Sequence, residues 1–167
     1  MPYSLWLVPE GTAGERLAET VRSLGARYHG PVFPPHVTLV GSFSGDRAVL
    51  MERSRQTAAA LKPLTVHLGR LDFTDTYFRD LFVHAGPRST LYNAHKLACE
   101  ILGVKSAPDF TPHLSLLYGN HPAKLKRQIV TELRGRLAVQ FKVRRLCLYN
   151  TSGDVENWHE VGSFKME

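Results

Sequence analysis

The sequence predicts an α+β domain in which two lobes of antiparallel sheet carry helices on their outer faces and enclose a central cleft. Strand-like and helix-like segments follow one another in a similar order in the two halves of the 167-residue chain. Two pairs of neighbouring strand segments are typical of antiparallel hairpins. A short alternating segment of the same pattern occurs once in each half, at His36 and at His113. The length favours a single domain over residues 1–167.

Apolar periodicity defines the elements of the first half. Leu17, Val21 and Leu24 recur at helical spacing, which predicts a helix with one buried face. Asp46 is positioned to cap a second helix, and Pro63 ends it. The expected order is a strand over 4–8, a helix over 11–28, a strand over 35–40, the helix between Asp46 and Pro63, and hairpin strands over 64–73 and 79–85.

The second half repeats this order. A helix that begins near Pro122 places Leu125, Ile129 and Leu133 on one face. Apolar residues alternate with polar ones after this helix, which predicts one long strand with a polar face. The expected order is a helix over 88–102, a strand over 112–117, the helix from 122, the long strand over 137–149 and a last strand over 158–164.

Composition narrows the function classes. A hydrophobic content of 43% and a charged content of 22% are ordinary for a soluble globular protein. The sequence has no apolar run long enough to span a membrane and no secretory signal pattern at its first residues. Two cysteines, Cys99 and Cys147, do not suggest a disulfide framework, so we expect a cytoplasmic protein. The net charge of +6 favours anionic partners such as nucleotides or RNA.

The two alternating segments carry the candidate site. Residues 35–40 read PHVTLV and residues 112–117 read PHLSLL. Successive side chains of a strand point to opposite faces, so His36 and Thr38 lie on one face, as do His113 and Ser115. The apolar residues between them then face the core. We predict that the two histidine–hydroxyl pairs face each other across the cleft.

Two His-x-(Thr/Ser)-x signatures, one in each half, resemble those of the 2H phosphoesterases. Residues 4–9 (SLWLVP), 33–41 (FPPHVTLVG) and 111–119 (TPHLSLLYG), with Trp158 followed by Val161, are similar to the plant and yeast cyclic phosphodiesterase branch. The resemblance implies a bilobal fold with pseudo-twofold symmetry, no metal requirement and no cofactor. It also implies a cyclic phosphodiester substrate, either a nucleoside 2′,3′-cyclic phosphate or ADP-ribose 1″,2″-cyclic phosphate.

The residue types suit this chemistry. Opening a cyclic phosphodiester needs a base for water and an acid for the leaving sugar oxygen, and histidine can serve as either near neutral pH. In-line displacement asks for one histidine on each side of phosphorus. The hydroxyls of Thr38 and Ser115 can donate hydrogen bonds to the non-bridging oxygens. By resemblance, His113 is the base, His36 is the acid and a 2′-phosphate remains.

Three aromatic residues are weaker substrate-binding candidates. Tyr118 lies five residues after His113, so a regular strand would point it to the opposite face, into the core. The resemblance makes Tyr118 a base-stacking or phosphate-contacting residue. Tyr77 and Phe78 lie in a hairpin turn, where they either stack on a nucleobase or pack against the protein.

Neither motif has the spacing of a metal site. The sequence has no His-x-His, no His-Glu-x-x-His and no carboxylate beside either motif, so we expect no metal. A short basic run, Lys124, Lys126 and Arg127, is expected to be a solvent-facing helix surface.

Two alternative functions remain open from the sequence. One is an RNA-end-processing 2H phosphoesterase, and the other is a non-catalytic module that binds a nucleotide or RNA. The intact histidine–hydroxyl pairs argue against the second alternative. The dispersed basic residues favour a small cyclic nucleotide or cyclic phosphate over RNA ends, and we expect a monomer that does not bind membranes.

Overall fold

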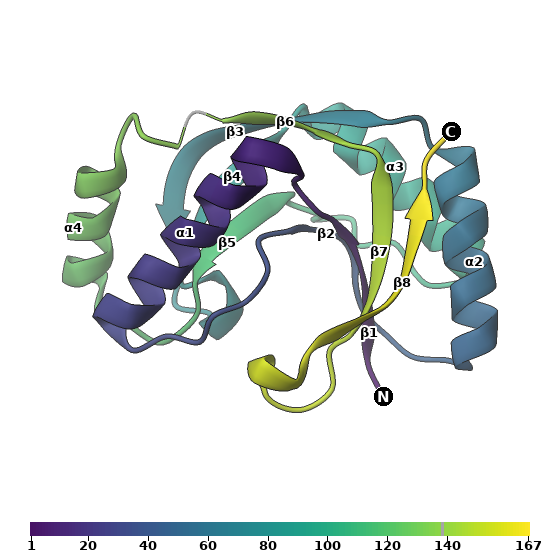
Figure 1. The fold of residues 1–167 in the computed structure, drawn as a ribbon, viewed down its shortest axis with the longest axis horizontal. Helices are drawn as coiled ribbons and strands as arrows, with labels where there is room; N and C mark the ends of the chain where they lie inside the picture. Colours follow the sequence, from purple (N-terminus) through teal and green to yellow (C-terminus); the bar gives the residue numbers. More distant parts are fainter. Residues whose placement is uncertain (138) are drawn as a thin grey trace.

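The fold is a strongly curled antiparallel sheet of eight strands with four helices against its outer surface (Figure 1). The computed structural model describes residues 1–137 and 139–167, and these counts refer to that part of the chain. The elements are β1 (Tyr3–Leu7), α1 (Gly11–Tyr28), β2 (Val37–Phe43), α2 (Arg47–Ala60), β3 (Leu64–Phe73), β4 (Leu81–Gly86), α3 (Arg88–Leu102), β5 (His113–Leu117), α4 (Ala123–Leu133), β6 (Gln140–Val143), β7 (Arg145–Asn150) and β8 (His159–Lys165).

The two predicted antiparallel sheets are the two halves of this one sheet. The strand order is β6-β3-β4-β5-β2-β1-β7-β8, and the halves join where Val37 of β2 pairs with Leu114 of β5. Helices α1 and α4 pack against the β6-β3-β4-β5 half, while α2 and α3 pack against the other half. The predicted α+β fold with two lobes and outer helices is thus confirmed (Figure 1).

The lobes do not follow the halves of the sequence. The first motif strand, β2, joins the lobe that contains the C-terminal strands β7 and β8. The second motif strand, β5, pairs with β4 of the central hairpin. This exchange makes the two motif strands neighbours at the centre of the sheet.

The apolar residues of the motifs form the centre of the core. Val37, Leu39, Leu114 and Leu116 are completely buried, as the alternating pattern predicts. Each fully buried Val or Leu side chain contributes about 1.5–3 kcal/mol relative to an exposed one. Their burial fixes which face of each strand points into the concave side of the sheet, and therefore where the histidines point.

The prediction of one long strand over 137–149 is wrong. The range contains β6 and β7, which pair with β3 in one lobe and with β1 in the other. Buried residues alternate up to Val143, two exposed residues follow, Arg144 and Arg145, and burial resumes at Leu146. This shift in the pattern marks the point where the chain passes from one lobe to the other. Ala138, within the predicted range, lies outside the described residues.

The sequence predicts that the basic run on α4 faces solvent, and this prediction is wrong for one of its three residues. Lys126 is completely buried, and its Nζ donates to the Thr74 carbonyl oxygen at 2.6 Å and to Asp80 Oδ1 at 3.0 Å. Asp80 is also completely buried and contacts Nδ1 of His121. The other ring nitrogen of His121 is 2.7 Å from the carbonyl oxygen of Tyr28, at the end of α1. This network ties residues 74–80 to both helices of their lobe.

Candidate active site

The two motif histidines have the same local geometry. His36 directly precedes β2, and His113 begins β5. Nδ1 of His36 lies 2.7 Å from the carbonyl oxygen of Pro34, and Nδ1 of His113 lies 2.8 Å from that of Thr111. Because a carbonyl oxygen only accepts, Nδ1 of each ring carries the proton and Nε2 keeps its lone pair. Each Nε2 is therefore available to exchange a proton with a substrate.

Both predicted histidine–hydroxyl pairs line one cavity of about 370 Å³. His36 and Thr38 come from β2 and the residue before it, whereas His113 and Ser115 come from β5. We call this space the catalytic cavity. It is lined by no Asp or Glu among the residues that the structure describes, so its polar groups suit an anion.

Burial holds both imidazoles neutral. Desolvation lowers the pKa of His36 to about 4, although its bond to the Pro34 carbonyl opposes the shift. Desolvation also lowers the pKa of His113 to about 4, and the nearby charge of Arg79 lowers it further. At neutral pH each ring in the free protein is therefore ready to accept a proton, and neither donates one without a change in its surroundings.

A stack of aromatic rings fixes the orientation of His36. The indole of Trp6 lies parallel to the imidazole with 3.5 Å between ring centroids, and Tyr149 stacks on Trp6 at 3.9 Å. Both partners come from neighbouring strands, β1 and β7, so strand pairing sets this geometry. An imidazolium gains from an aromatic face, so the stack partly offsets the cost of charging His36.

The two hydroxyls differ in the free protein. Ser115 Oγ donates to the carbonyl oxygen of Phe78 at 2.7 Å, so it must rotate before it can donate to a substrate. Thr38 Oγ1 makes no hydrogen bond to any residue that the structure describes, and it faces the catalytic cavity. The sequence predicts equal roles for the pair, whereas the structure has one hydroxyl free and one engaged.

The three aromatic candidates have different surroundings. Tyr118 lines the catalytic cavity because β5 ends at Leu117 and its alternation does not continue. It is only 3% exposed and stacks on Phe33 at 3.7 Å, so it forms a wall of the cavity. Burial raises its pKa above the usual range of a phenol. Phe78 is 48% exposed and lines the cavity, whereas Tyr77 is absent from its lining and packs edge-on against Phe78.

Among the cavity residues without a role predicted from the sequence are three large side chains, Trp6, Trp158 and Arg79. Trp6 and Trp158 lie in segments that carry the family resemblance, which was a usable signal. Trp158 comes within 5.6 Å of Phe78, between ring centroids, from the opposite lobe. Arg79 also lines the cavity, but its position before β4 gave no sign that it would meet His113.

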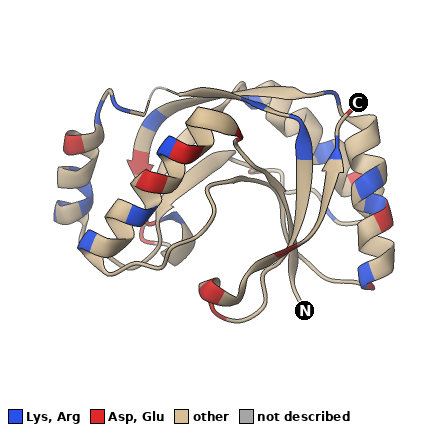
Figure 2. Ribbon diagram, viewed as in Figure 1, with Lys and Arg blue, Asp and Glu red and all other residues tan. Residues whose placement is uncertain are grey.

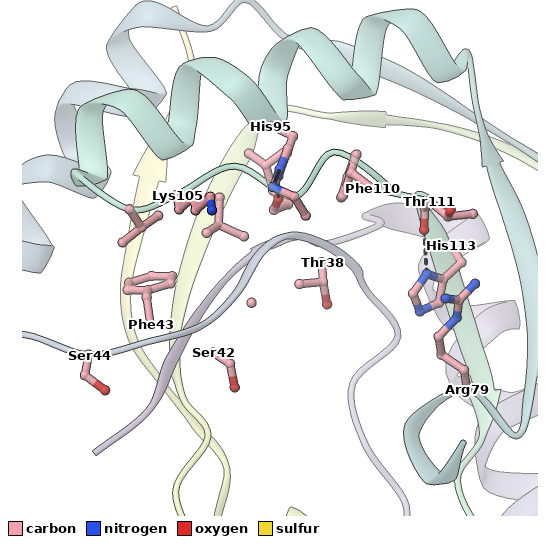
Figure 3. A pocket seen from close by; sticks show the side chains of 15 residues that line it. Thr38, Ser42, Phe43, Ser44, Arg79, His95, Lys105, Phe110, Thr111 and His113 are labelled. Atoms are coloured by element: carbon pink, nitrogen blue, oxygen red, sulfur yellow. Dashed lines mark hydrogen bonds between the residues drawn. The ribbon is translucent and has the colours of Figure 1, made fainter. Parts of the chain in front are cut away.

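Arg79 is the one Lys or Arg among the described residues that line the catalytic cavity. Its guanidinium lies 4.7 Å from the ring centroid of Phe82, and Figure 3 shows it beside His113. Its Nε is buried and has no hydrogen-bond partner among the described residues. No described carboxylate forms an ion pair with Arg79. An unpaired guanidinium beside two histidines and two hydroxyls is a suitable anchor for a phosphoryl group.

The described residues contain neither a cluster of metal-ligating side chains nor a helix suited to crossing a membrane. Within residues 1–137 and 139–167, no group of three or more His, Cys, Asp or Glu side chains could hold a metal ion. In the same residues, no helix has the length and apolar character needed to cross a bilayer.

The fold and the paired motifs define the class of a two-histidine phosphoesterase. The sequence profile of the 2′-5′ RNA ligase superfamily matches residues 9–155. The chain belongs to this superfamily, the 2H phosphoesterases.

Individual proteins resemble the chain in sequence or in fold. A cyclic phosphodiesterase of Arabidopsis thaliana is 25% identical over 171 residues, which cover 95% of this chain and 92% of that protein. The crystal structure of TT0787 of Thermus thermophilus has a TM-score of 0.66 and 15% identity, covering 99% of this chain and 98% of that one. Apo LigT of E. coli has a TM-score of 0.60 and 15% identity, covering 99% and 96%.

Proposed function

We propose that the protein hydrolyses cyclic phosphodiesters without a metal ion. The substrate is a nucleoside 2′,3′-cyclic phosphate, opened to a 2′-phosphate, or ADP-ribose 1″,2″-cyclic phosphate, opened to ADP-ribose 1″-phosphate. One observation carries the proposal: His36 and His113 each hold Nδ1 on a carbonyl and leave Nε2 free within one carboxylate-free cavity. The similarity to the cyclic phosphodiesterase of Arabidopsis thaliana supports the substrate class.

Phosphate binding precedes the chemistry. The free hydroxyl of Thr38 and the unpaired guanidinium of Arg79 donate hydrogen bonds to the non-bridging oxygens of the cyclic phosphate. Ser115 turns away from the Phe78 carbonyl and donates a third hydrogen bond. These donors are fixed before the reaction, so they stabilise the charge that builds on phosphorus oxygens at little reorganisation cost.

We assign the two roles as the family resemblance implies, with His113 as the base that takes a proton from water and His36 as the acid. The charge of Arg79 supports this assignment because it helps to keep His113 unprotonated, the form that a general base needs. His36 stacks on Trp6, which favours its charged form, and it acts as the acid. Water attacks phosphorus, the bond from phosphorus to the 3′ oxygen breaks, and His36 gives its proton to that oxygen.

Substrate binding causes His36, the general acid, to take up the proton that it later donates. His36 has a pKa of about 4 in the free protein, so it is neutral at pH 7. A cyclic phosphate carries one negative charge, and its arrival beside His36 raises the pKa of the imidazole. The enzyme therefore takes up a proton when it binds substrate, and the proton on His36 is present when the leaving oxygen needs it.

The nucleoside of the substrate binds between Phe78 and Trp158, a part of the cavity that we call the aromatic mouth. Phe78 and Trp158 face one another from opposite lobes, and Phe78 is half exposed. A nucleobase stacks on such a surface, which is worth about 1–3 kcal/mol per base. Tyr118 supports this surface from within the cavity through its contacts with both rings, and Tyr77 supports it through its edge contact with Phe78.

The cavity is complete within one chain, so we propose that the protein acts as a monomer. Its two cysteines are unpaired and buried. They are compatible with a reducing compartment, and we place the protein in the cytoplasm.

Turnover of adenosine 2′,3′-cyclic phosphate in EDTA tests the proposal. His36→Gln and His113→Gln should each lower kcat by about 10²–10⁴-fold, the usual contribution of a general acid or base. His67→Gln is the matched control, because His67 is exposed on β3 and does not line the catalytic cavity. Activity that needs added metal, or motif variants as active as the control, would exclude this mechanism.

A further inference from the structure

A second cavity, whose lining residues Figure 3 shows, shares lining residues with the catalytic cavity. It has a volume of about 470 Å³ and lies between the end of β2 and the loop of residues 103–112 that connects α3 to β5. Thr38, Arg79 and His113 line both cavities. The two spaces therefore meet at the position proposed for the reacting phosphate, and one substrate can occupy both.

This second cavity, which we call the Lys105 groove, is lined by cations and no described acidic residue. Figure 3 shows Lys105 at one end of the groove and His113 with Arg79 at the other, with Thr38 between them. Neither Lys105 nor Arg79 forms an ion pair with a carboxylate in the described part of the chain. The groove thus offers one cation at the reacting phosphate and a second cation beyond it.

The positive charge of the groove is local. Figure 2 shows the other Lys and Arg residues spread over both helices and strands, with Asp and Glu among those on the outer helices. The residues that make up the net charge of +6 are therefore dispersed along the fold in this view. Lys105 instead marks a single position, which suits one additional anionic group of a short ligand.

The walls of the groove are rigid. His95 is buried, its Nδ1 lies 2.7 Å from the Leu39 carbonyl oxygen, and its Nε2 accepts from the Ala107 N–H at 3.1 Å. Phe110 stacks on this ring with 4.1 Å between centroids. His95 is thereby fully engaged and does not serve as a reacting group. A preformed wall limits the ordering cost of binding a ligand beside it.

We propose that the Lys105 groove is a subsite for a second phosphoryl-bearing unit of the substrate, with Lys105 as the counter-ion of that phosphoryl group. The proposal deepens the proposed function, because the groove begins at the reacting phosphate. The same chemistry occurs in two ligands: the internal phosphodiester of a short RNA end and the diphosphate of an ADP-ribose derivative. Both carry anionic charge at a covalently fixed distance from the reacting phosphate.

Calorimetric binding of three reaction products tests the subsite without turnover. The ligands are adenosine 2′-monophosphate, a dinucleotide that ends in a 2′-monophosphate, and ADP-ribose 1″-phosphate. We expect at least one of the two longer ligands to bind the wild type about tenfold more tightly than adenosine 2′-monophosphate. Lys105→Gln should remove this gain and Lys105→Glu should reverse it. Lys124→Gln, an exposed lysine on α4 outside both cavities, should keep the gain.

The outcomes separate this proposal from the proposed function. A gain confined to the dinucleotide supports the subsite and assigns it to an RNA end, whereas a gain confined to ADP-ribose 1″-phosphate supports it and assigns it to a diphosphate. Equal affinities for all three ligands, no binding, or equal weakening of all three by Lys105→Gln would overturn the subsite. If the protein hydrolyses cyclic phosphates but the longer ligands do not bind more tightly, the proposed activity is supported and the subsite is overturned. If the longer ligands bind more tightly in a Lys105-dependent way but no cyclic phosphate is hydrolysed, the subsite is supported and the proposed activity is overturned.

Discussion

Replacing His36 by asparagine should make the protein less sensitive to acid. His36 is 7% exposed, and burial lowers its pKa to about 4 from an unfolded value of 6.5. The unfolded state therefore binds more protons than the folded state between these two values, and the free energy of unfolding falls as the pH is lowered through this window. Asparagine cannot titrate, and its amide nitrogen can still donate to the Pro34 carbonyl oxygen as Nδ1 of His36 does.

The size of the effect follows from the shift in pKa. The lowered pKa corresponds to about 3 kcal/mol once the pH is well below 4. At pH 4.5 most of this penalty is present, about 2–3 kcal/mol. His113 contributes a comparable penalty, so removal of His36 should remove about half of their combined effect.

Urea denaturation at pH 7.5 and at pH 4.5 measures this difference. The quantity of interest is the drop in the free energy of unfolding between the two pH values, because the packing lost with the imidazole contributes at both and cancels. The drop should be about 2–3 kcal/mol smaller in His36→Asn than in the wild type. His67→Asn, at an exposed position, should behave as the wild type. An equal drop in His36→Asn and the wild type would refute the conclusion that burial holds His36 neutral.

Two further predictions concern charged residues. Arg79→Gln should lower kcat for adenosine 2′,3′-cyclic phosphate by about 10²-fold, because it removes a cation that binds the phosphate. It should also raise the pKa of His113, because a nearby positive charge is removed. NMR titration of His113 measures this second effect, and an unchanged pKa would contradict the assigned contact. Lys126→Met should lower the free energy of unfolding by about 3–5 kcal/mol, because it leaves the buried Asp80 carboxylate without its ammonium partner. Urea denaturation checks this, with the exposed Lys124→Met as control, and equal stabilities would show that His121 alone satisfies Asp80.

Local patterns were sufficient to predict most of the fold and the centre of the site. The alternation in residues 35–40 and 112–117 fixes which side chains enter the core, and it correctly groups each histidine with its hydroxyl in one cavity. These predictions succeed because strand periodicity and burial are properties of neighbouring residues. Helices α1 and α4 follow from the same kind of pattern, since Leu17, Val21, Leu24 and Ile129 are buried as expected.

Features that depend on distant contacts were beyond this reasoning. Arg79 meets His113 only because β4 pairs with β5, and Ser115 meets the Phe78 carbonyl through the same pairing. Lys126 is buried because Asp80, remote in sequence, lies under α4. The break after β6 is visible as two adjacent exposed arginines, but only the topology reveals that the two pieces belong to different lobes.

The two similar motifs have different neighbours, on which the proposed division of roles depends. Both histidines use the same bond from Nδ1 to the carbonyl two residues earlier, so the motifs themselves do not tell acid from base. Trp6 stacks on His36, whereas Arg79 lies beside His113. In the proposed mechanism, the asymmetry between the two histidines therefore comes from β1 and from the turn before β4.

Phosphorus NMR of the product of adenosine 2′,3′-cyclic phosphate tests the central claim most directly. In the proposed mechanism His113 and His36 lie on opposite sides of phosphorus, and the adenine ring is held at the aromatic mouth. Only one ring oxygen of the cyclic phosphate can then receive the proton from His36. The account predicts adenosine 2′-monophosphate as the single product in EDTA, formed at least about 10²-fold more slowly by His36→Gln and by His113→Gln. A mixture of 2′- and 3′-monophosphates, or the 3′-monophosphate alone, would contradict it.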